Sequence, residues 1–240
     1  MNIKNQDIGL FYGIGVGPGD PELITLRAAR ILSRVAVIFT PQKDEQSPSY
    51  AYRIIAGIVT EPAQRVIELV FPMRKNDRGL IEYWQRAADT IWQHLSSGDD
   101  CAFITEGDPL LYGTFIYVFD ILQKDHPELN VEVIPGISSI NAAAARALVP
   151  LVSGSERLAI LPATYGDEAI TEALQNFDTV VLLKINTVFE RLLGILEKLS
   201  LVDRCVYVRR CTTEDEEIIR DIRQLKGQKL DYLSLLIVRR

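Results

Sequence analysis

Three stretches rich in glycine and aspartate hold the residues whose types and spacing best suit ligand chemistry. GIGVGPGDPELIT spans 13–25, EGDPLLYG spans 106–113 and PGISS spans 135–139. The alternating glycines of the first stretch leave its backbone without Cβ atoms, so another group can lie against it. This stretch lacks the spacing of a dinucleotide fingerprint and the Gly-Lys-Ser/Thr ending of a P-loop. On these residues alone, a turn that serves only tight strand-to-helix packing stays open.

Side chains typical of hydrolases and metalloenzymes are sparse. The chain has two histidines, His94 and His126, both in polar surroundings, and it has no G-x-S-x-G elbow. No cluster of His, Asp and Glu has the spacing of a metal site. We therefore assign no catalytic residue and no metal ligand. Asp20 is a candidate base, but it is also placed to be the N-cap of the helix that follows it.

The composition is typical of a globular protein without a broad basic surface. The 240 residues are 48% hydrophobic and carry a formal net charge of −6, which argues against nucleic-acid binding. Cys101, Cys205 and Cys211 form no C-x-x-C pair, so a disulfide framework or zinc site is not indicated and a reducing cytoplasm fits. No run approaches 18 apolar residues and no signal-peptide pattern is present, so we expect a cytoplasmic protein without a membrane anchor.

Strand and helix patterns alternate around the three stretches. Short apolar runs predict strands at 8–12, 35–39, 65–71, 99–105 and 131–135. Helical patterns lie between these runs, which predicts a parallel sheet with helices on both faces. All three stretches then follow the carboxyl ends of strands, where open α/β sheets bind ligands.

The second half of the chain alternates less regularly and predicts a separate, mixed α/β sheet. Its strand patterns lie at 157–162, 179–184, 204–210 and 232–238. A helix is expected near 216–225. We therefore expect an N-terminal α/β domain over 1–135 and a C-terminal α/β domain over 136–240.

Together the three stretches resemble the tetrapyrrole methylase family, the S-adenosylmethionine-dependent C-methyltransferases of corrin and sirohaem synthesis. The motifs GIGVGPGDPELIT, TEGDPLLYGTF and VIPGISSINAAAA carry the resemblance, which covers essentially the whole chain. The LLYGTF extension, the FPM strand end and the chain length most resemble the C(20)-methyltransferases of precorrin-2 or cobalt-factor II. The resemblance implies methyl transfer in cobalamin biosynthesis by a homodimer, with S-adenosylmethionine bound in a cleft between the two domains of each subunit.

The resemblance also implies the cofactor contacts, residue by residue. They fall on Pro18, Glu106, Gly107, Asp108, Leu111, Ser138, Ser139, Lys184 and Cys211. Family members often have Gly-Gly-Asp where Glu106 begins its motif, Thr-Ala at the serine pair, methionine at Lys184 and glycine at Cys211. An ammonium group beside a sulfonium would be repelled, so Lys184 should direct its charge elsewhere.

The reduced tetrapyrrole implied as substrate carries many carboxylates, so basic residues should gather where it binds. Arg74, Lys75 and Arg78, just past the third predicted strand, are the first choice because arginine binds carboxylates bidentately. Arg27 and Arg30 are the second choice. For all five residues, a role as solvated surface stays open.

Other functions stay open as well. A sister methylase acting on uroporphyrinogen III, on precorrin-4 or, in the diphthine synthase branch, on a protein would share these loops. A nucleotide-binding oxidoreductase would bind NAD(P)H. A non-catalytic protein would bind S-adenosylmethionine or a tetrapyrrole without turnover. Calorimetry with each cofactor and the position of a transferred methyl label would separate these functions.

Overall fold

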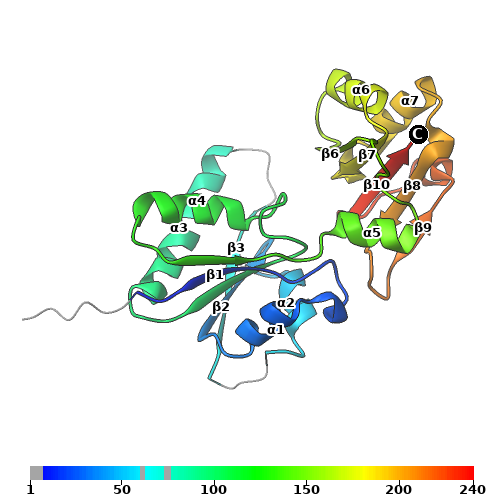
Figure 1. The fold of residues 1–240 in the computed structure, drawn as a ribbon. Helices are drawn as coiled ribbons and strands as arrows, with labels where there is room; N and C mark the ends of the chain where they lie inside the picture. The colour runs from blue at the N-terminus through cyan, green and yellow to red at the C-terminus, as the bar shows by residue number, and fades with distance from the viewer. Residues whose placement is uncertain (1–7, 60–62, 73–76) are drawn as a thin grey trace, which may run out of the picture. The chain divides into compact units, whose positions relative to one another are not determined.

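The computed structural model describes residues 8–59, 63–72 and 77–240, without the side chains of 77 and 78. The chain divides into two compact units, one ending at Ser138 and the other beginning at Ser139. From the sequence we expected the division between 135 and 136, in the same connection. Each unit has its own five-stranded sheet (Figure 1).

The N-terminal unit is built on a parallel sheet with the strand order β3-β2-β4-β1-β5. Its strands are β1 (Phe11–Gly15), β2 (Val37–Gln42), β3 (Arg65–Val70), β4 (Cys101–Thr105) and β5 (Val131–Ile134). All residues of β1 and β4 are buried. Continuous burial without polar alternation is typical of parallel strands that are covered on both faces. The parallel sheet expected from the sequence is confirmed.

Helices cover both faces of this sheet (Figure 1). They are α1 (Leu26–Leu32), α2 (Tyr50–Ile55), α3 (Asp77–Leu95) and α4 (Phe115–Asp125). α1 and α2 pack on one face, in a buried cluster that includes Ile14 and Ile104. α3 and α4 pack on the other face, in a cluster that includes Phe103 and Phe115. Packing in these two clusters holds each helix on its face of the sheet, and the loop before each helix must therefore run toward that face.

The N-cap prediction for Asp20 is right in position but wrong about the helix it serves. Asp20 Oδ1 accepts a hydrogen bond from Glu22 N at 2.8 Å. It caps a short 3-10 turn, η1 (Pro21–Leu23), and not α1. Thr25 has extended backbone angles and is the N-cap of α1. The extended backbone at the cap separates the turn from the helix, which the sequence pattern had joined.

The C-terminal unit is built on a mixed sheet with the strand order β6-β7-β10-β8-β9. Its strands are β6 (Leu158–Pro162), β7 (Thr179–Leu183), β8 (Cys205–Arg209), β9 (Glu217–Ile219) and β10 (Ser234–Arg239). β6 and β7 are parallel, and β10 is antiparallel to both β7 and β8. β7 and β8 therefore run in the same direction and end at the same edge of the sheet.

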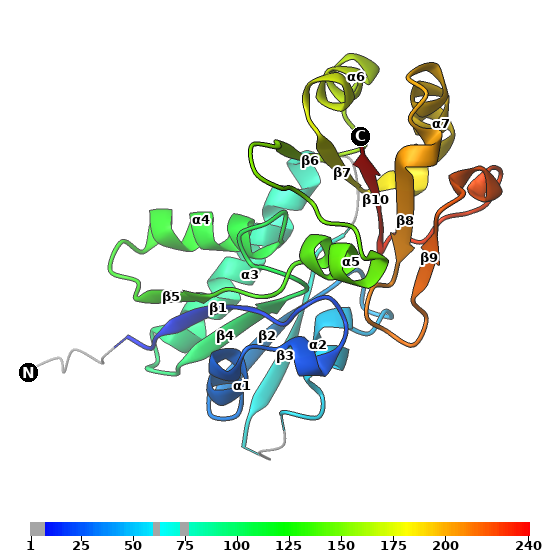
Figure 2. The same cartoon turned by 45° about the vertical axis from the view of Figure 1, so that its right-hand side comes forward.

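Helical segments also cover both faces of the second sheet (Figure 2). They are α5 (Ser139–Ala147) on one face, and on the other α6 (Asp167–Asn176), α7 (Phe189–Lys198) and the 3-10 turns η2 (Ile185–Thr187), η3 (Val202–Arg204) and η4 (Ile222–Leu225). The helix expected near 216–225 is wrong, because β9 pairs with β8 there and only η4 is helical. Ile219 and Ile222 both contact the core, so their spacing satisfies burial without a continuous helix.

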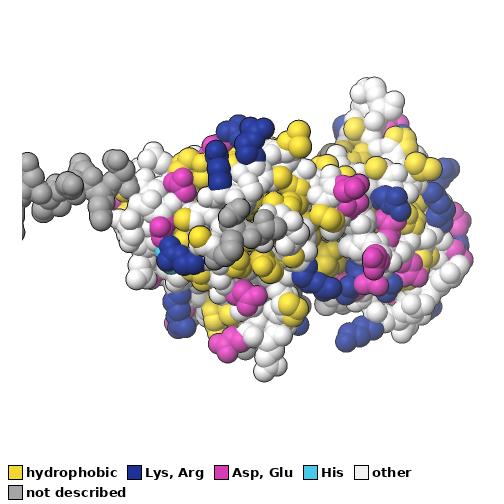
Figure 3. All heavy atoms as spheres, turned by 90° about the horizontal axis from the view of Figure 1, so that it is seen from below, with side chains coloured by type: hydrophobic (Ala, Val, Ile, Leu, Met, Phe, Trp, Pro, Cys, Tyr) yellow, Lys and Arg dark blue, Asp and Glu magenta, His cyan; other side chains and the backbone are white. Residues whose placement is uncertain are grey.

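Charges of both signs are mixed on the surface. In the face drawn in Figure 3, Lys and Arg side chains lie among Asp and Glu side chains, with apolar groups between them. Neither sign dominates this view, as the small net charge of −6 also indicates. Among the residues that the structure describes, no helix is long and apolar enough to cross a bilayer.

Candidate functional site

The loops that follow β1, β4 and β5 meet at the carboxyl edge of the N-terminal sheet. Gly17 and Gly107 form an isolated antiparallel bridge, in which the Gly107 N–H donates to the Gly17 carbonyl oxygen at 2.8 Å. The Gly136 N–H donates to Asp108 Oδ2 at 3.1 Å. The first loop is thus bonded to the second and the second to the third. The three stretches singled out in the sequence form one site.

Gly15 and Gly136 are required at this junction because of the space available. A Cβ atom added at Gly15 would lie 2.5 Å from the Gly107 carbonyl oxygen and 2.6 Å from Gly136 N. A Cβ atom added at Gly136 would lie 2.8 Å from the Gly15 carbonyl carbon. These neighbours are backbone atoms, which cannot move aside as the end of a flexible side chain can. The close approach of three backbones therefore fixes the shape of the edge.

Large apolar side chains are exposed on two of these loops. Leu110, Leu111 and Tyr112 after β4 and Ile137 after β5 are between 36% and 55% exposed. Tyr112 has a φ of 55°, a left-handed conformation that is uncommon for a bulky residue and clusters at functional sites. Exposed apolar groups beside a bare backbone suit a flat apolar ring.

Glu106 places a carboxyl group at the same edge. Burial raises the pKa of this carboxyl, and the N–H groups of Glu106 itself and of Ala51 lower it in part. Ala51 belongs to α2, and the hydroxyl of Tyr50, the first residue of α2, donates to the Pro18 carbonyl oxygen at 3.4 Å. The carboxyl group therefore lies where α2, the first loop and the second loop come together.

Buried polar groups hold α2 against the sheet. Thr40 in β2 and Ser49 are both buried and hydrogen-bonded to each other, and Ser49 also accepts from Tyr52 N at 3.3 Å as the N-cap of α2. Gln42 Oε1, at the end of β2, is buried and has no hydrogen-bond partner among the described residues. Neither Gln42 nor Ser49 was singled out from the sequence, because both lie in an ordinary polar segment before α2.

The remaining predicted cofactor contacts lie outside this junction. Ser138 is buried at the end of the N-terminal unit, and Ser139 begins α5 in the other unit. Lys184 follows β7 in a left-handed conformation and is exposed. Cys211 follows β8 and is buried in an apolar cluster. Because β7 and β8 run in the same direction, Lys184 and Cys211 lie at the same edge of the C-terminal sheet.

Ion pairs hold the segment that follows β8. Arg146 Nε donates to both carboxylate oxygens of Glu216, at 2.8 and 2.9 Å, and this guanidinium holds the pKa of Glu216 below its usual value. Glu216 Oε2 also accepts from Thr212 N at 2.7 Å. Burial raises the pKa of the neighbouring Cys211 thiol to about 12, so this cysteine is not a thiolate near neutral pH.

The histidines lie at the other end of the N-terminal sheet. His94 Nδ1 is 3.1 Å from Asp99 Oδ2, just before the start of β4, and His126 stacks on Trp92. Neither is near the junction of the three loops. Among the described residues, no three His, Cys, Asp or Glu side chains gather as a metal site.

The first-choice substrate residues cannot be placed. Arg74 and Lys75 lie outside the described residues, and Arg78 lies in α3 without a described side chain. The second choice, Arg27 and Arg30, lies on α1 at an open pocket.

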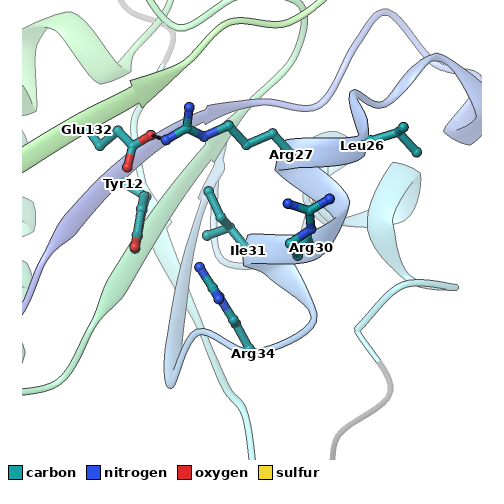
Figure 4. Close-up of a pocket in the computed structure, with 7 residues that line it drawn as sticks. All are labelled: Tyr12, Leu26, Arg27, Arg30, Ile31, Arg34 and Glu132. Carbon is teal, nitrogen blue, oxygen red and sulfur yellow. Dashed lines mark ion pairs between the residues drawn. The ribbon is translucent and has the colours of Figure 1, made fainter.

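Figure 4 shows the side chains that line this pocket, which has a volume of about 390 Å³. It is lined by Tyr12, Leu26, Arg27, Arg30, Ile31, Arg34 and Glu132. Arg27 forms an ion pair with Glu132 of β5. Arg30 and Arg34 are exposed, and no described carboxylate forms a salt bridge with either of them. Two guanidinium groups are therefore available to an anionic ligand.

Comparison with known proteins gives a match over most of the chain. Residues 10–225 match the family described as Tetrapyrrole (Corrin/Porphyrin) Methylases. The chain is 37% identical over 238 residues to the probable cobalt-precorrin-2 C(20)-methyltransferase of Methanocaldococcus jannaschii, covering 98% of each chain. It is 28% identical over 239 residues to the precorrin-2 C(20)-methyltransferase of a Sinorhizobium species, covering 96% of this chain and 95% of the relative.

A solved structure has the same two-domain fold. It is the uroporphyrin-III C-methyl transferase from Thermus thermophilus complexed with S-adenyl homocysteine, with a TM-score of 0.67 and 22% identity. The match covers 96% of this chain and 97% of that one. The fold class expected from the sequence, two α/β domains, is confirmed.

Proposed function

Because the chain belongs to the tetrapyrrole methylase family, we propose that it methylates the C(20) meso carbon of precorrin-2 or cobalt-factor II, with S-adenosylmethionine as donor. The observation that carries this proposal is the 37% identity, over 98% of both chains, with a relative named for this reaction. The reaction would belong to cobalamin biosynthesis. The junction of three loops supports the proposal, because its polar groups and exposed apolar side chains suit the polar and apolar parts of S-adenosylmethionine.

The described residues at the junction fit S-adenosylmethionine. The backbones of Gly107 and Gly136 pack closely, because a Cβ atom added at Gly136 would clash with the Gly107 carbonyl oxygen, and Leu111 and Ile137 offer apolar contact to an adenine ring. We propose that the cofactor contacts are Pro18, Glu106, Gly107, Asp108, Leu111 and Ser138 from the N-terminal unit, and Ser139, Lys184 and Cys211 from the C-terminal unit.

S-adenosylmethionine supplies a methyl group on a positively charged sulfur, so the transfer needs no acid. The protein then has to orient the two reactants in line and to exclude water from them. The close backbone packing of Gly15 against Gly107 and Gly136 holds the three loops beside one another and suits this role. The Asp20 carboxylate accepts the Glu22 N–H, so its established role is that of a cap, and we assign no general base.

Basic residues would hold the carboxylates of the tetrapyrrole. Arg74, Lys75 and Arg78 remain the first choice, and Arg27 and Arg30 at the pocket beside α1 are the second, although Arg27 is already paired with Glu132. Arg74→Ala should raise KM for the tetrapyrrole far more than KM for S-adenosylmethionine, since it removes a carboxylate partner only. Equal effects on both values of KM would overturn this assignment.

The proposed assembly is a cytoplasmic homodimer. It rests on the family resemblance alone. Light scattering of the purified protein at several concentrations would test it: a mass near twice 27.0 kDa supports the dimer, and a mass of one chain throughout overturns it.

Methyl-labelled S-adenosylmethionine tests the reaction itself. The protein is incubated with the label and precorrin-2, with and without cobalt, and the labelled carbon is located in the product. Label at C(20) is expected. Label at another carbon would favour a sister methylase. Binding of the cofactor without transfer would favour a non-catalytic protein, and binding of NAD(P)H in its place would favour an oxidoreductase.

A further inference from the structure

A row of three arginines follows one face of α1. Arg27, Arg30 and Arg34 are separated by three and four residues, and Arg34 lies in the turn that continues the helix after Leu32. Residues at these separations are neighbours on a helix, where like charges repel each other. All three arginines are exposed. A protein with a net charge of −6 therefore keeps three positive charges close together.

The chain offsets this repulsion only in part. Arg27 forms an ion pair with Glu132 of β5, whereas no described carboxylate forms a salt bridge with Arg30 or Arg34. An anion from solution that contacts both of these guanidinium groups would reduce the remaining repulsion and gain charge-assisted hydrogen bonds.

The same arginines line the open pocket beside α1. Its volume of about 390 Å³ lies within the range of about 300–1,000 Å³ that is typical of small-molecule sites. The pocket wall also includes the buried Tyr12 and Ile31 and the exposed Leu26. In Figure 4 the Arg34 side chain extends from the end of α1 toward Ile31. Guanidinium groups beside an apolar wall suit an anion that has an organic part.

The pocket extends away from the junction of the three loops. Tyr12 is paired with Glu132 across β1 and β5, and it lies three residues before Gly15, about 10 Å along an extended strand. Arg34 lies between the end of α1 and the start of β2. The start of a parallel strand is at the amino edge of its sheet, opposite the three loops. The pocket therefore runs along α1 and the edge strand β5, and the cofactor junction lies at the other end.

We propose that this pocket is an anion-binding site separate from the cofactor junction, and that its ligand is a small molecule with two oxyanion groups, phosphate or carboxylate. Arg30 and Arg34 hold the two groups. They lie about 6 Å apart along the helix axis, roughly one turn, and a guanidinium group can bind either kind of oxyanion with two parallel hydrogen bonds. This inference goes beyond the proposed function, because the ligand is neither the methyl donor nor the methyl acceptor.

Titration calorimetry of the full chain tests the site. Inorganic pyrophosphate and succinate are the probes, because one carries two phosphate groups and the other two carboxylates. We expect at least one probe to bind, and to bind more weakly as the salt concentration is raised. Binding of pyrophosphate alone would assign a phosphate ligand, and binding of succinate alone would assign a carboxylate ligand. Either result supports the site.

Arginine variants locate the bound probe. Arg30→Ala and Arg34→Ala should each weaken binding about tenfold or more, because each removes charge-assisted hydrogen bonds. Arg53→Ala is the matched control: Arg53 is an exposed arginine of α2 that does not line the pocket. This control changes the net charge equally and should leave binding unchanged.

Competition separates the site from the cofactor junction. An excess of S-adenosylhomocysteine should leave the affinity for the probe unchanged, since the two sites do not overlap. A loss of probe binding under this condition would overturn a separate site.

Other results would overturn the inference as well. If neither probe binds with a dissociation constant below about 10 mM, the arginines form a solvated surface. Equal weakening by Arg34→Ala and Arg53→Ala would show an effect of net charge alone. If Arg34→Ala raises KM for the tetrapyrrole and not for S-adenosylmethionine, the pocket holds the methylation substrate. Failure of methyl transfer itself would remove the proposed function and leave this inference standing.

Discussion

The proposed cofactor contacts lie at one edge of each sheet. The loops at the N-terminal edge and the loops at the C-terminal edge are held by different kinds of interaction. At the N-terminal edge, backbone meets backbone: Gly17 bonds to Gly107, and Gly15 lies against Gly136. At the C-terminal edge, ion pairs between charged side chains hold the loops. Arg146 holds Glu216 there, and Arg210 Nε donates to Asp231 Oδ2 at 2.7 Å.

This difference predicts how each edge tolerates change. Backbone contacts depend on the absence of Cβ atoms, so they fail on the smallest substitution but do not themselves depend on pH. At the N-terminal edge a carboxylate takes part as well, because Asp108 Oδ2 accepts from the Gly136 N–H. Ion pairs tolerate changes of shape but depend on pH and salt.

The largest effect should come from Gly136→Ala. The added Cβ atom would meet the backbone of Gly15 and Gly107, so we expect the free energy of unfolding to fall by about 3 kcal/mol. Urea unfolding would measure it. Gly194→Ala is the control: Gly194 lies within α7 with nothing within 4 Å of the added atom, and alanine there should stabilise by about 0.5–1 kcal/mol. Equal effects at both positions would break the comparison.

Arg146→Ala should have a smaller effect, and one that depends on pH. The pKa of Glu216 is lowered in the folded protein, first by Arg146, so its stabilisation is present above the unfolded pKa and is lost as pH falls through the folded pKa. We expect a loss of about 1 kcal/mol at pH 7, discounted because the Arg146 side chain is 57% exposed.

The same unfolding experiment at acid pH completes this test. The loss caused by Arg146→Ala should shrink below about pH 4, as Glu216 becomes protonated in both states. Arg86→Ala removes a surface pair with Glu82 in which both side chains are over 70% exposed, and it should change nothing measurable. A loss from Arg146→Ala that is constant with pH would contradict the electrostatic account of this edge.

Glu106→Gln should increase the stability of the ligand-free protein near neutral pH. The folded pKa of Glu106 is raised, so the folded state is favoured below the unfolded pKa and loses stability as pH rises through the folded pKa. Glutamine carries no charge, so the variant should be more stable than the unmodified protein at pH 8, with no gain below about pH 4. Thermal unfolding across this range measures the difference. A variant less stable at pH 8 would mean that the charge is already compensated.

The smallest expected signal is the reactivity of the buried cysteines. Burial raises the pKa of Cys101 in β4 and of Cys211 after β8 to about 12 each, and neither thiol is exposed. In the native protein at pH 8, iodoacetamide should modify both slowly and at similar rates, as mass spectrometry of the digested protein would show. Much faster modification of Cys211 would mean that the edge held by side chains opens more readily than the sheet core.

The sequence predicted the first unit better than the second. Continuous apolar runs such as 99–105 are typical of strands in a parallel sheet covered on both faces, and four of the five strands of the first unit overlap the expected ranges closely. The first strand was expected at 8–12, but β1 is Phe11–Gly15, so Gly13 and Gly15 belong to the strand and not to the loop. The helix near 216–225 was wrong because isoleucines spaced for a helix can also be buried by a short edge strand followed by a 3-10 turn. Spacing along the chain does not distinguish a helix from a short edge strand here, because the pairing of β9 with β8 depends on the rest of the sheet.

The candidate site was predictable in part for the same reason. The glycines at 13–19, the Glu106 motif and the PGISS stretch are visible in the sequence because their residue types are unusual and their chemistry is local. Gln42 and the pairing of Thr40 with Ser49 were missed, because an ordinary polar residue acquires its importance only from what lies beside it in space.

By itself, the sequence determined the family, the alternation of strands and helices, and three stretches able to approach a ligand. Only the tertiary structure decided that Gly15, Gly107 and Gly136 touch one another, and that desolvation raises the pKa of Glu106 whereas Arg146 lowers that of Glu216. The reason is physical. Propensity and spacing depend on neighbours along the chain, whereas close approach, desolvation and charge pairing depend on neighbours in space, brought together by strands far apart in sequence.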